Sequence, residues 1–258
     1  MDPTTSAPAP AGSTWPREPR SLAAGRAISW WGEGWKIFRA APVPWLLIAL
    51  AFIVIQVLLN QIPVIGTLGG SLLTPVLMGG LLLGCHGLAQ GRPLAFGQLF
   101  AAFSSDRLVP LLILGALMLA ASILIAMIAF GAMFGAGTSA YLGGASLDSS
   151  SAALGAGMAS FGLMSIVGGL FALLAGVVFY MAWWFAPALV AITGVGPVEA
   201  LKASFRGATA NLGGVLLSLL ILIVLSILSM VTFGLAWLVL LPVLVGADYA
   251  SWREVYGE

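Results

Sequence analysis

Long uncharged stretches rich in apolar residues alternate with short polar ones along most of this chain. The first extends from Ala40 to Gly91, with His86 taken as neutral, and is more than twice the roughly 20 residues that one membrane-spanning helix needs. It therefore predicts two helices, separated by the polar and helix-breaking residues of Asn60–Pro63. The same pattern predicts six spans in all, at about 44–60, 65–88, 108–134, 163–193, 212–231 and 235–250.

Composition indicates the same class of protein. Hydrophobic residues make up 60% of the chain and charged residues 7%, and the mean hydropathy is +1.09. A soluble domain has about 25% charged residues, so this chain lacks the polar surface needed to cover itself in water. The apolar stretches are continuous and do not alternate with polar residues, which is typical of helices and not of a membrane barrel. We therefore predict an all-α integral membrane protein whose partner is the lipid bilayer, with no nucleic acid.

Two segments are predicted to lie outside the helices. Residues 1–25 begin with a run of Pro, Ala, Ser and Thr that can bury too little apolar surface to fold. We expect a disordered cytoplasmic tail there, ahead of a single membrane domain at 26–258. A Gly/Ser-rich stretch at 135–162 contains Asp148 and predicts a long loop, whose apolar residues would allow it to lie on the membrane.

The distribution of charge predicts the orientation of the helices. With six spans, one side of the membrane receives both ends of the chain and the segments 90–107 and 194–211. The only charge on the other side is Asp148. Because positively charged segments are retained in the cytoplasm, both termini are expected there. The first side holds every lysine and arginine of the chain: Arg17, Arg20, Arg26, Lys36, Arg39, Arg92, Arg107, Lys202, Arg206 and Arg253.

Three parts of the chain share one pattern. A short amphipathic segment precedes each odd-numbered span. Phe38, Phe103 and Phe205 in these segments each stand seven residues before a residue at the start of the span, namely Trp45, Pro110 and Leu212. Each even-numbered span carries a proline followed by small and aliphatic residues: Pro75, Pro187 and Pro242. The distance between the two markers is 37 residues in the first and last parts and 84 in the middle one. We predict three parallel repeats of an interfacial helix and a transmembrane hairpin, and the alternative is a chance match between apolar sequences of low complexity.

Two ionisable residues within the predicted spans are candidates for an intramembrane polar site. Asp248 lies about 20 Å into the sixth span, a depth at which carboxylates often belong to ion or proton pathways. The alternative is that a small shift of the helix leaves Asp248 hydrated or paired at the interface. His86, the only histidine, lies near the cytoplasmic end of the second span, and its alternative is a structural role.

Motifs for catalysis, metal binding or nucleotide binding are absent from the sequence. The single cysteine, Cys85, excludes an intramolecular disulfide and a Cys-rich metal site. We therefore predict no catalytic residue, no metal site and no cofactor.

Several motifs resemble an uncharacterised family of bacterial polytopic inner-membrane proteins, over about residues 26–257. The resemblance implies a multi-pass protein of the bacterial inner membrane, and it implies no activity and no catalytic residue. The motifs are Trp35-Lys36-Ile37-Phe38 with Pro42 and Trp45, Trp184-Phe185-Ala186-Pro187-Ala188-Leu189, Ala200-Leu201-Lys202-Ala203-Ser204-Phe205-Arg206, Leu241-Pro242-Val243 and Tyr249-Ala250-Ser251-Trp252-Arg253-Glu254.

Two functions from different classes fit these observations. The absence of a chemical constellation favours a non-enzymatic inner-membrane protein with a structural, regulatory or envelope-associated role. The predicted repeats, the helix-breaking prolines and Asp248 favour a small carrier or channel for a solute or an ion.

Overall fold

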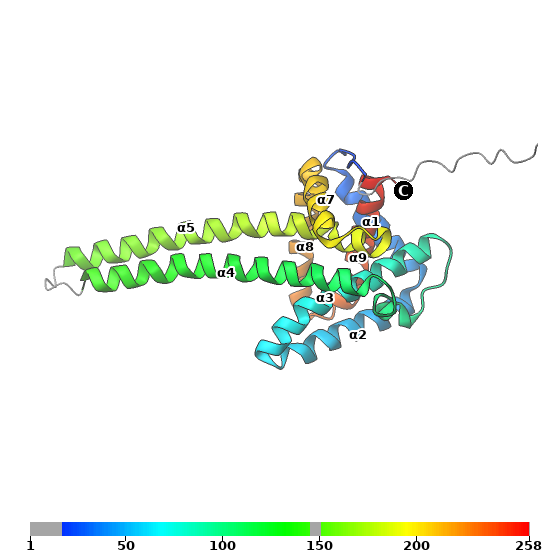
Figure 1. Ribbon diagram of the computed structural model, residues 1–258, viewed down its shortest axis with the longest axis horizontal. Coiled ribbons are helices and arrows are strands. Elements are labelled where there is room, and N and C mark those ends of the chain that lie inside the picture. The colour runs from blue at the N-terminus through cyan, green and yellow to red at the C-terminus, as the bar shows by residue number, and fades with distance from the viewer. Residues whose placement is uncertain (1–16, 145–150, 258) are drawn as a thin grey trace, which may run out of the picture.

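All regular structure in the described residues is helical. The structure is a computed structural model that describes residues 17–144 and 151–257 (Figure 1). The α-helices are α1 (Arg26–Ala40), α2 (Pro42–Asn60), α3 (Pro63–Ala89), α4 (Leu108–Gly144), α5 (Ser151–Trp184), α6 (Ala186–Ala188), α7 (Pro197–Ala210), α8 (Leu212–Met230) and α9 (Trp237–Tyr256). A 3₁₀ helix, η1 (Phe96–Ser104), precedes α4, and a short π-helix, η2 (Leu189–Thr193), follows α6.

Five helical segments are long and apolar enough to cross a membrane, which supports the predicted class. They are Pro42–Asn60, Leu68–Ala89, Leu108–Gly131, Ser165–Thr193 and Leu212–Met230, and they correspond to the first five predicted spans. The sixth predicted span, 235–250, falls within α9. This helix also carries Asp248, Arg253 and Glu254, and it is not among the five.

The predicted breaks between paired spans are present and have local causes. Helix α2 ends at Asn60, and Pro63, which has no backbone N–H to satisfy, begins α3. Between α8 and α9, Phe233 and Gly234 both have positive φ, at 51° and 84°. Because the left-handed region cannot continue a right-handed helix, the chain turns there.

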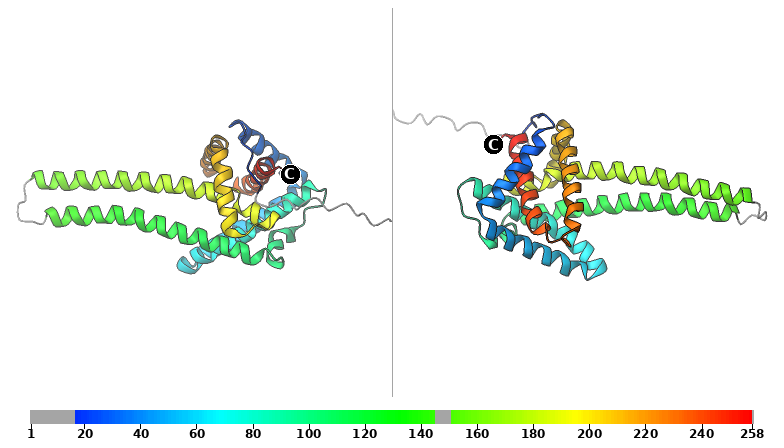
Figure 2. Two further views of the ribbon diagram at one scale, coloured as in Figure 1. Left: turned by 45° about the horizontal axis from the view of Figure 1, so that its top comes forward. Right: turned by 180° about the vertical axis from the view of Figure 1, so that it is seen from behind.

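The predicted loop at 135–162 is wrong where the structure describes it. Helix α4 continues to Gly144 and α5 begins at Ser151, so the third span continues ten residues beyond 134 and the fourth begins twelve residues before 163. The two helices run side by side over their length (Figures 1 and 2). Glycine costs an isolated helix about 1 kcal/mol. In lipid, however, the backbone must be hydrogen-bonded within the helix, and small residues allow a partner helix to approach. Asp148 lies outside the described residues.

The fourth predicted span is not one continuous helix, because Pro187 interrupts it. Proline lacks a backbone N–H and clashes with the carbonyl four residues earlier, so α5 ends at Trp184 and the chain continues as α6 and η2. The hydroxyl of Ser204 in α7 enters this gap. It accepts a hydrogen bond of 2.9 Å from the Phe185 N–H and donates one of 2.9 Å to the Met181 carbonyl. The Phe185 N–H and the Met181 carbonyl, which would otherwise bond to each other within the helix, are thereby satisfied.

The three hairpins, α2–α3, α4–α5 and α8–α9, extend in different directions from a common body (Figures 1 and 2). Each predicted amphipathic segment is helical and packs on the second helix of one hairpin. η1 lies on α3, α7 lies on α5, and α1 near the start of the chain lies on α9 at its end. The segments around the three prolines, in α3, α6–η2 and α9, contact one another at the centre, where Leu77, Phe185, Leu189 and Val245 are fully buried.

Glycines allow two of these packings to bring backbone against backbone. Where α1 crosses α9, a Cβ built on Gly34 would collide with the Val243 carbonyl, and one on Gly246 would lie 2.7 Å from the Gly34 Cα. Where η1 crosses α3, a Cβ on Gly80 would lie 2.5 Å from the Leu99 carbonyl oxygen. Neither crossing has room for a side chain.

The C-terminal end of α9 is tied to α7 and to the N-terminal segment. The Tyr256 hydroxyl donates a hydrogen bond of 2.7 Å to the Ala203 carbonyl. This buried hydrogen bond joins the end of α9 to α7.

Residues 17–25 have a defined place, although the sequence predicted a disordered tail as far as residue 25. The Arg20 N–H donates to the Val255 carbonyl at 2.8 Å. The Asn211 side chain accepts a hydrogen bond from the Leu22 N–H and donates one to the Arg20 carbonyl, each 2.8 Å long. A polar residue at the start of α8 therefore holds a segment that has little apolar surface of its own.

The α1–α9 crossing generates a prediction with a matched control in the same helix. Gly34→Ala should destabilise the protein by about 1–3 kcal/mol, because the added methyl group overpacks the crossing. Gly32→Ala should be neutral or stabilising, because no atom lies within 4 Å of its Cβ position and alanine favours the helix. Thermal unfolding of the detergent-purified variants measures both changes in stability. Equal unfolding midpoints for the two variants would contradict the close contact between α1 and α9 at Gly34.

Candidate functional site

The two residues singled out in the sequence lie at one helix junction. His86 is in the last turns of α3, and Asp248 is in α9, which packs against α3. Side chains from α5 complete the group. We call it the junction cluster, and it comprises Cys85, His86, Tyr180, Trp184, Asp248, Tyr249 and Ser251.

Asp248 occupies the most unusual environment in the cluster. Its Oδ1 atom is shielded from solvent and has no hydrogen-bond partner in the structure. Tyr180, whose ring packs against Trp184 with centroids 5.2 Å apart, also has a hydroxyl that is shielded from solvent and has no hydrogen-bond partner. No ion pair to Asp248 is present within 17–144 and 151–257. Two polar atoms of the cluster are thus shielded from solvent and unsatisfied, which is uncommon in proteins.

A hydrogen bond between distant parts of the chain fixes one side of the cluster. The Trp184 Nε1–H donates to the Ser251 hydroxyl at 3.1 Å, and this bond is buried. Ser251 in turn donates to the backbone carbonyl of Asp248 at 2.8 Å. The end of α5 is therefore attached to α9 one helical turn from the carboxylate.

His86 belongs to the exposed side of the cluster. Its Nδ1 is 3.3 Å from the Tyr249 hydroxyl, and its Nε2 is 2.8 Å from the Gln90 side-chain nitrogen. The ring also packs edge-on against Trp252, with centroids 6.5 Å apart. Both ring nitrogens have partners, and these contacts hold the end of α3 against α9.

The sequence identified Asp248 and His86 but not Tyr180, Trp184 or Ser251. Trp184 and the neighbouring Trp252 are both buried, at 5% and 0% exposure. The available signal was helical spacing, since Tyr180 and Trp184 are four residues apart and Asp248 and Ser251 are three apart.

Other polar residues of the predicted spans have local partners. The Gln56 side-chain nitrogen donates to the Thr74 hydroxyl at 3.2 Å, which joins α2 to α3. The Gln61 side chain donates to the Val57 carbonyl at 3.4 Å at the end of α2. Both contacts lie at or near the end of α2.

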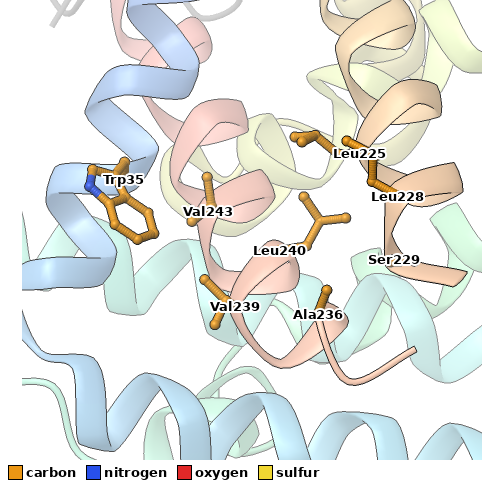
Figure 3. Close-up of a pocket in the computed structure, with 8 residues that line it drawn as sticks. All are labelled: Trp35, Leu225, Leu228, Ser229, Ala236, Val239, Leu240 and Val243. Atoms are coloured by element: carbon orange, nitrogen blue, oxygen red, sulfur yellow. The ribbon is translucent and has the colours of Figure 1, made fainter. Parts of the chain in front are cut away.

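A separate hollow between α1, α8 and α9 has an almost wholly apolar lining (Figure 3). Its volume is about 390 Å³. Its one hydroxyl, on Ser229, already donates to the Ser226 carbonyl at 2.6 Å. The hollow suits an acyl chain and offers no group for chemistry. It is lined by Trp35, Leu225, Leu228, Ser229, Ala236, Val239, Leu240 and Val243.

The junction cluster therefore has one carboxylate, one thiol and two phenols, together with one imidazole on its exposed side. Such a set can exchange a proton or hold a cation. In the part of the chain that the structure describes, no three His, Cys, Asp or Glu side chains come together as metal ligands.

The Trp184–Ser251 bond can be tested by a double-mutant cycle. Ser251→Ala should destabilise the protein by about 1–3 kcal/mol, because it leaves the buried indole N–H without an acceptor. In a Trp184→Phe background the same substitution should cost much less, since that donor is gone. Thermal unfolding of the four proteins gives the coupling energy, and a value near zero would show that the bond does not form.

Comparison with known proteins identifies no relative of this chain. The chain matches no family model, no curated protein and no solved structure.

Proposed function

We propose that the chain is a non-enzymatic protein of the bacterial inner membrane with a structural, regulatory or envelope-associated role. In this proposal six helices cross the bilayer as three repeats, and both termini are cytoplasmic. Five apolar helices long enough to span a membrane support the location in a membrane.

The sixth span is supported by the surroundings of α9. Its residues 240–243 and 245–247 are buried against other helices, so they face protein and not lipid. A helix enclosed in this way does not need the hydropathy of a lipid-facing one, and it can carry a charged residue. Its length of 20 residues is enough to span.

The repeats are supported by the recurrence of one set of helix contacts. Each amphipathic helix touches the second helix of a hairpin and also its first: η1 touches α3 and α2, α7 touches α5 and α4, and α1 touches α9 and α8. The three prolines fall in the three central segments. Each amphipathic helix thus packs on the hairpin before it in the chain, and α1, which has none before it, packs on the α8–α9 hairpin. Chance similarity between apolar sequences does not by itself produce this recurring arrangement.

The observation that carries the structural role is the apolar interior. Among the described residues that are buried, the polar ones other than aromatic residues are Ser204, Asn211, Ser218, Ser229 and Ser251, and none of these is charged, whereas Asp248 is partly buried. A carrier or channel needs polar groups or water along a path through its centre. The central segments of α3, α6–η2 and α9 instead meet through aliphatic side chains and phenylalanine.

A small carrier or channel is the second candidate, and the junction cluster favours it. The unsatisfied Asp248 Oδ1 and Tyr180 hydroxyl are the groups that would hold a proton or cation. A hollow of about 250 Å³ between α3, α4 and α5 is also lined by hydroxyls. Two of them are occupied, however, since Thr74 donates to the Gly70 carbonyl and Ser122 to the Leu119 carbonyl.

Flux measurements distinguish the two functions. Proteoliposomes containing the purified protein should leak H⁺, Na⁺ and K⁺ no faster than empty liposomes, because the apolar centre offers no path. Asp248→Asn, which keeps the shape of the side chain and removes its charge, should behave identically. Flux that requires the wild-type protein and disappears in Asp248→Asn would establish the carrier instead.

Reporter fusions test the orientation. A fluorescent protein joined to the C-terminus should be bright, and a phosphatase that needs disulfides should be inactive there, because the cytoplasm is reducing. The two signals should reverse when the same reporters are inserted after Thr232, in the turn between α8 and α9. An active phosphatase at the C-terminus would exclude a cytoplasmic end.

A further inference from the structure

An arginine-lined pocket lies where the N-terminal segment meets α1 and the end of α9. Its volume is about 420 Å³, within the range of about 300–1,000 Å³ that is usual for ligand pockets. Its lining shares no residue with the junction cluster or with the apolar hollow of Figure 3. Its lining is mainly polar and consists of Arg20, Arg26, Ser29, Trp30, Glu33, Ala250, Arg253 and Glu254.

The two carboxylates of the pocket are already occupied. Glu254 accepts a 2.7 Å hydrogen bond from Arg26 Nε on one oxygen and a 2.7 Å bond from Trp30 Nε1 on the other. Glu33 is paired with Lys36 outside the pocket at 2.7 Å. The negative charge of the lining is therefore neutralised by fixed partners.

The other two arginines have no carboxylate partner in the described part of the chain. The Arg253 guanidinium lies over the Tyr249 ring, 5.8 Å from its centre. The Arg20 guanidinium packs on Gly257, where a Cβ would lie 2.7 Å from it. Both contacts are to uncharged groups, so the positive charges of Arg20 and Arg253 are uncompensated and their N–H donors remain available in the pocket.

We propose that this pocket binds a phosphate group, either in the headgroup of an anionic phospholipid or in a soluble phosphate compound. The planar guanidinium pairs with phosphate oxygens through two parallel hydrogen bonds, and two arginines facing one pocket match its charge. Ser29, exposed on the same wall, supplies a neutral donor. Basic pockets beside membrane helices bind lipid headgroups in this manner.

Binding can be measured on the full-length protein in a nonionic detergent, by native mass spectrometry and by ligand-induced thermal shift. The probes are dioleoylphosphatidylglycerol, its phosphate-free counterpart dioleoylglycerol, glycerol 3-phosphate and inorganic phosphate. Arg20→Gln/Arg253→Gln should weaken phosphate-dependent binding at least about tenfold, because two charge-assisted contacts are lost. Arg39→Gln is the matched control, since Arg39 is an exposed arginine of α1 outside the pocket, and it should bind as wild type does.

A second pair of variants leaves every arginine in place. Ser29→Glu adds a carboxylate to the pocket and should abolish binding, whereas Ser29→Gln, of similar size and uncharged, should retain it. Binding of phosphatidylglycerol alone identifies the headgroup, and equal binding of the soluble phosphates identifies a soluble ligand. Equal binding of dioleoylglycerol, unchanged binding in the arginine or Ser29→Glu variants, or no binding of any probe would overturn the proposal.

Discussion

At the crossing of α1 and α9, Gly34 and Gly246 bring two helix backbones together with no side chain between them. In lipid, where apolar association gains little, such close packing is a principal source of attraction between helices. The crossing also joins the first helix of the chain to the last. The position of the Arg20 segment, the enclosure of α9 and the walls of the arginine pocket all depend on it.

The placement of apolar surface and polar contacts in this fold follows from what lipid requires of side chains and backbone. Large apolar side chains remain exposed along α2, α4, α5 and α8, among them Leu58, Leu124, Leu174 and Ile227. Water would not tolerate this surface, whereas a bilayer covers it. Polar contacts are then concentrated where helices meet, as at the Pro187 break, where one serine hydroxyl serves two backbone groups.

Features with a local cause were predictable from the sequence, whereas features that depend on distant partners were not. Pro63 and the Phe233–Gly234 turn mark breaks that short-range sterics determine, and Asp248 and His86 stand out as polar residues in apolar stretches. Residues 135–144 and 151–162 are helical because α4 and α5 pack against each other. A short stretch of sequence does not reveal such packing. The contact of Trp184 with Ser251 likewise depends on how α5 packs against α9, since the two residues are 67 positions apart in the sequence.

The order in which the ribosome makes these helices has a consequence for their assembly. Helix α1 emerges early, but α9, against which it packs, begins about two hundred residues later. At roughly 5–20 residues per second, the face of α1 that carries Gly34 waits roughly 10–40 s for its partner. During synthesis that face must rest on lipid or on the insertion machinery. This crossing can therefore form only after α9 has been made, and a chain without α9 leaves the Gly34 face of α1 without its main partner.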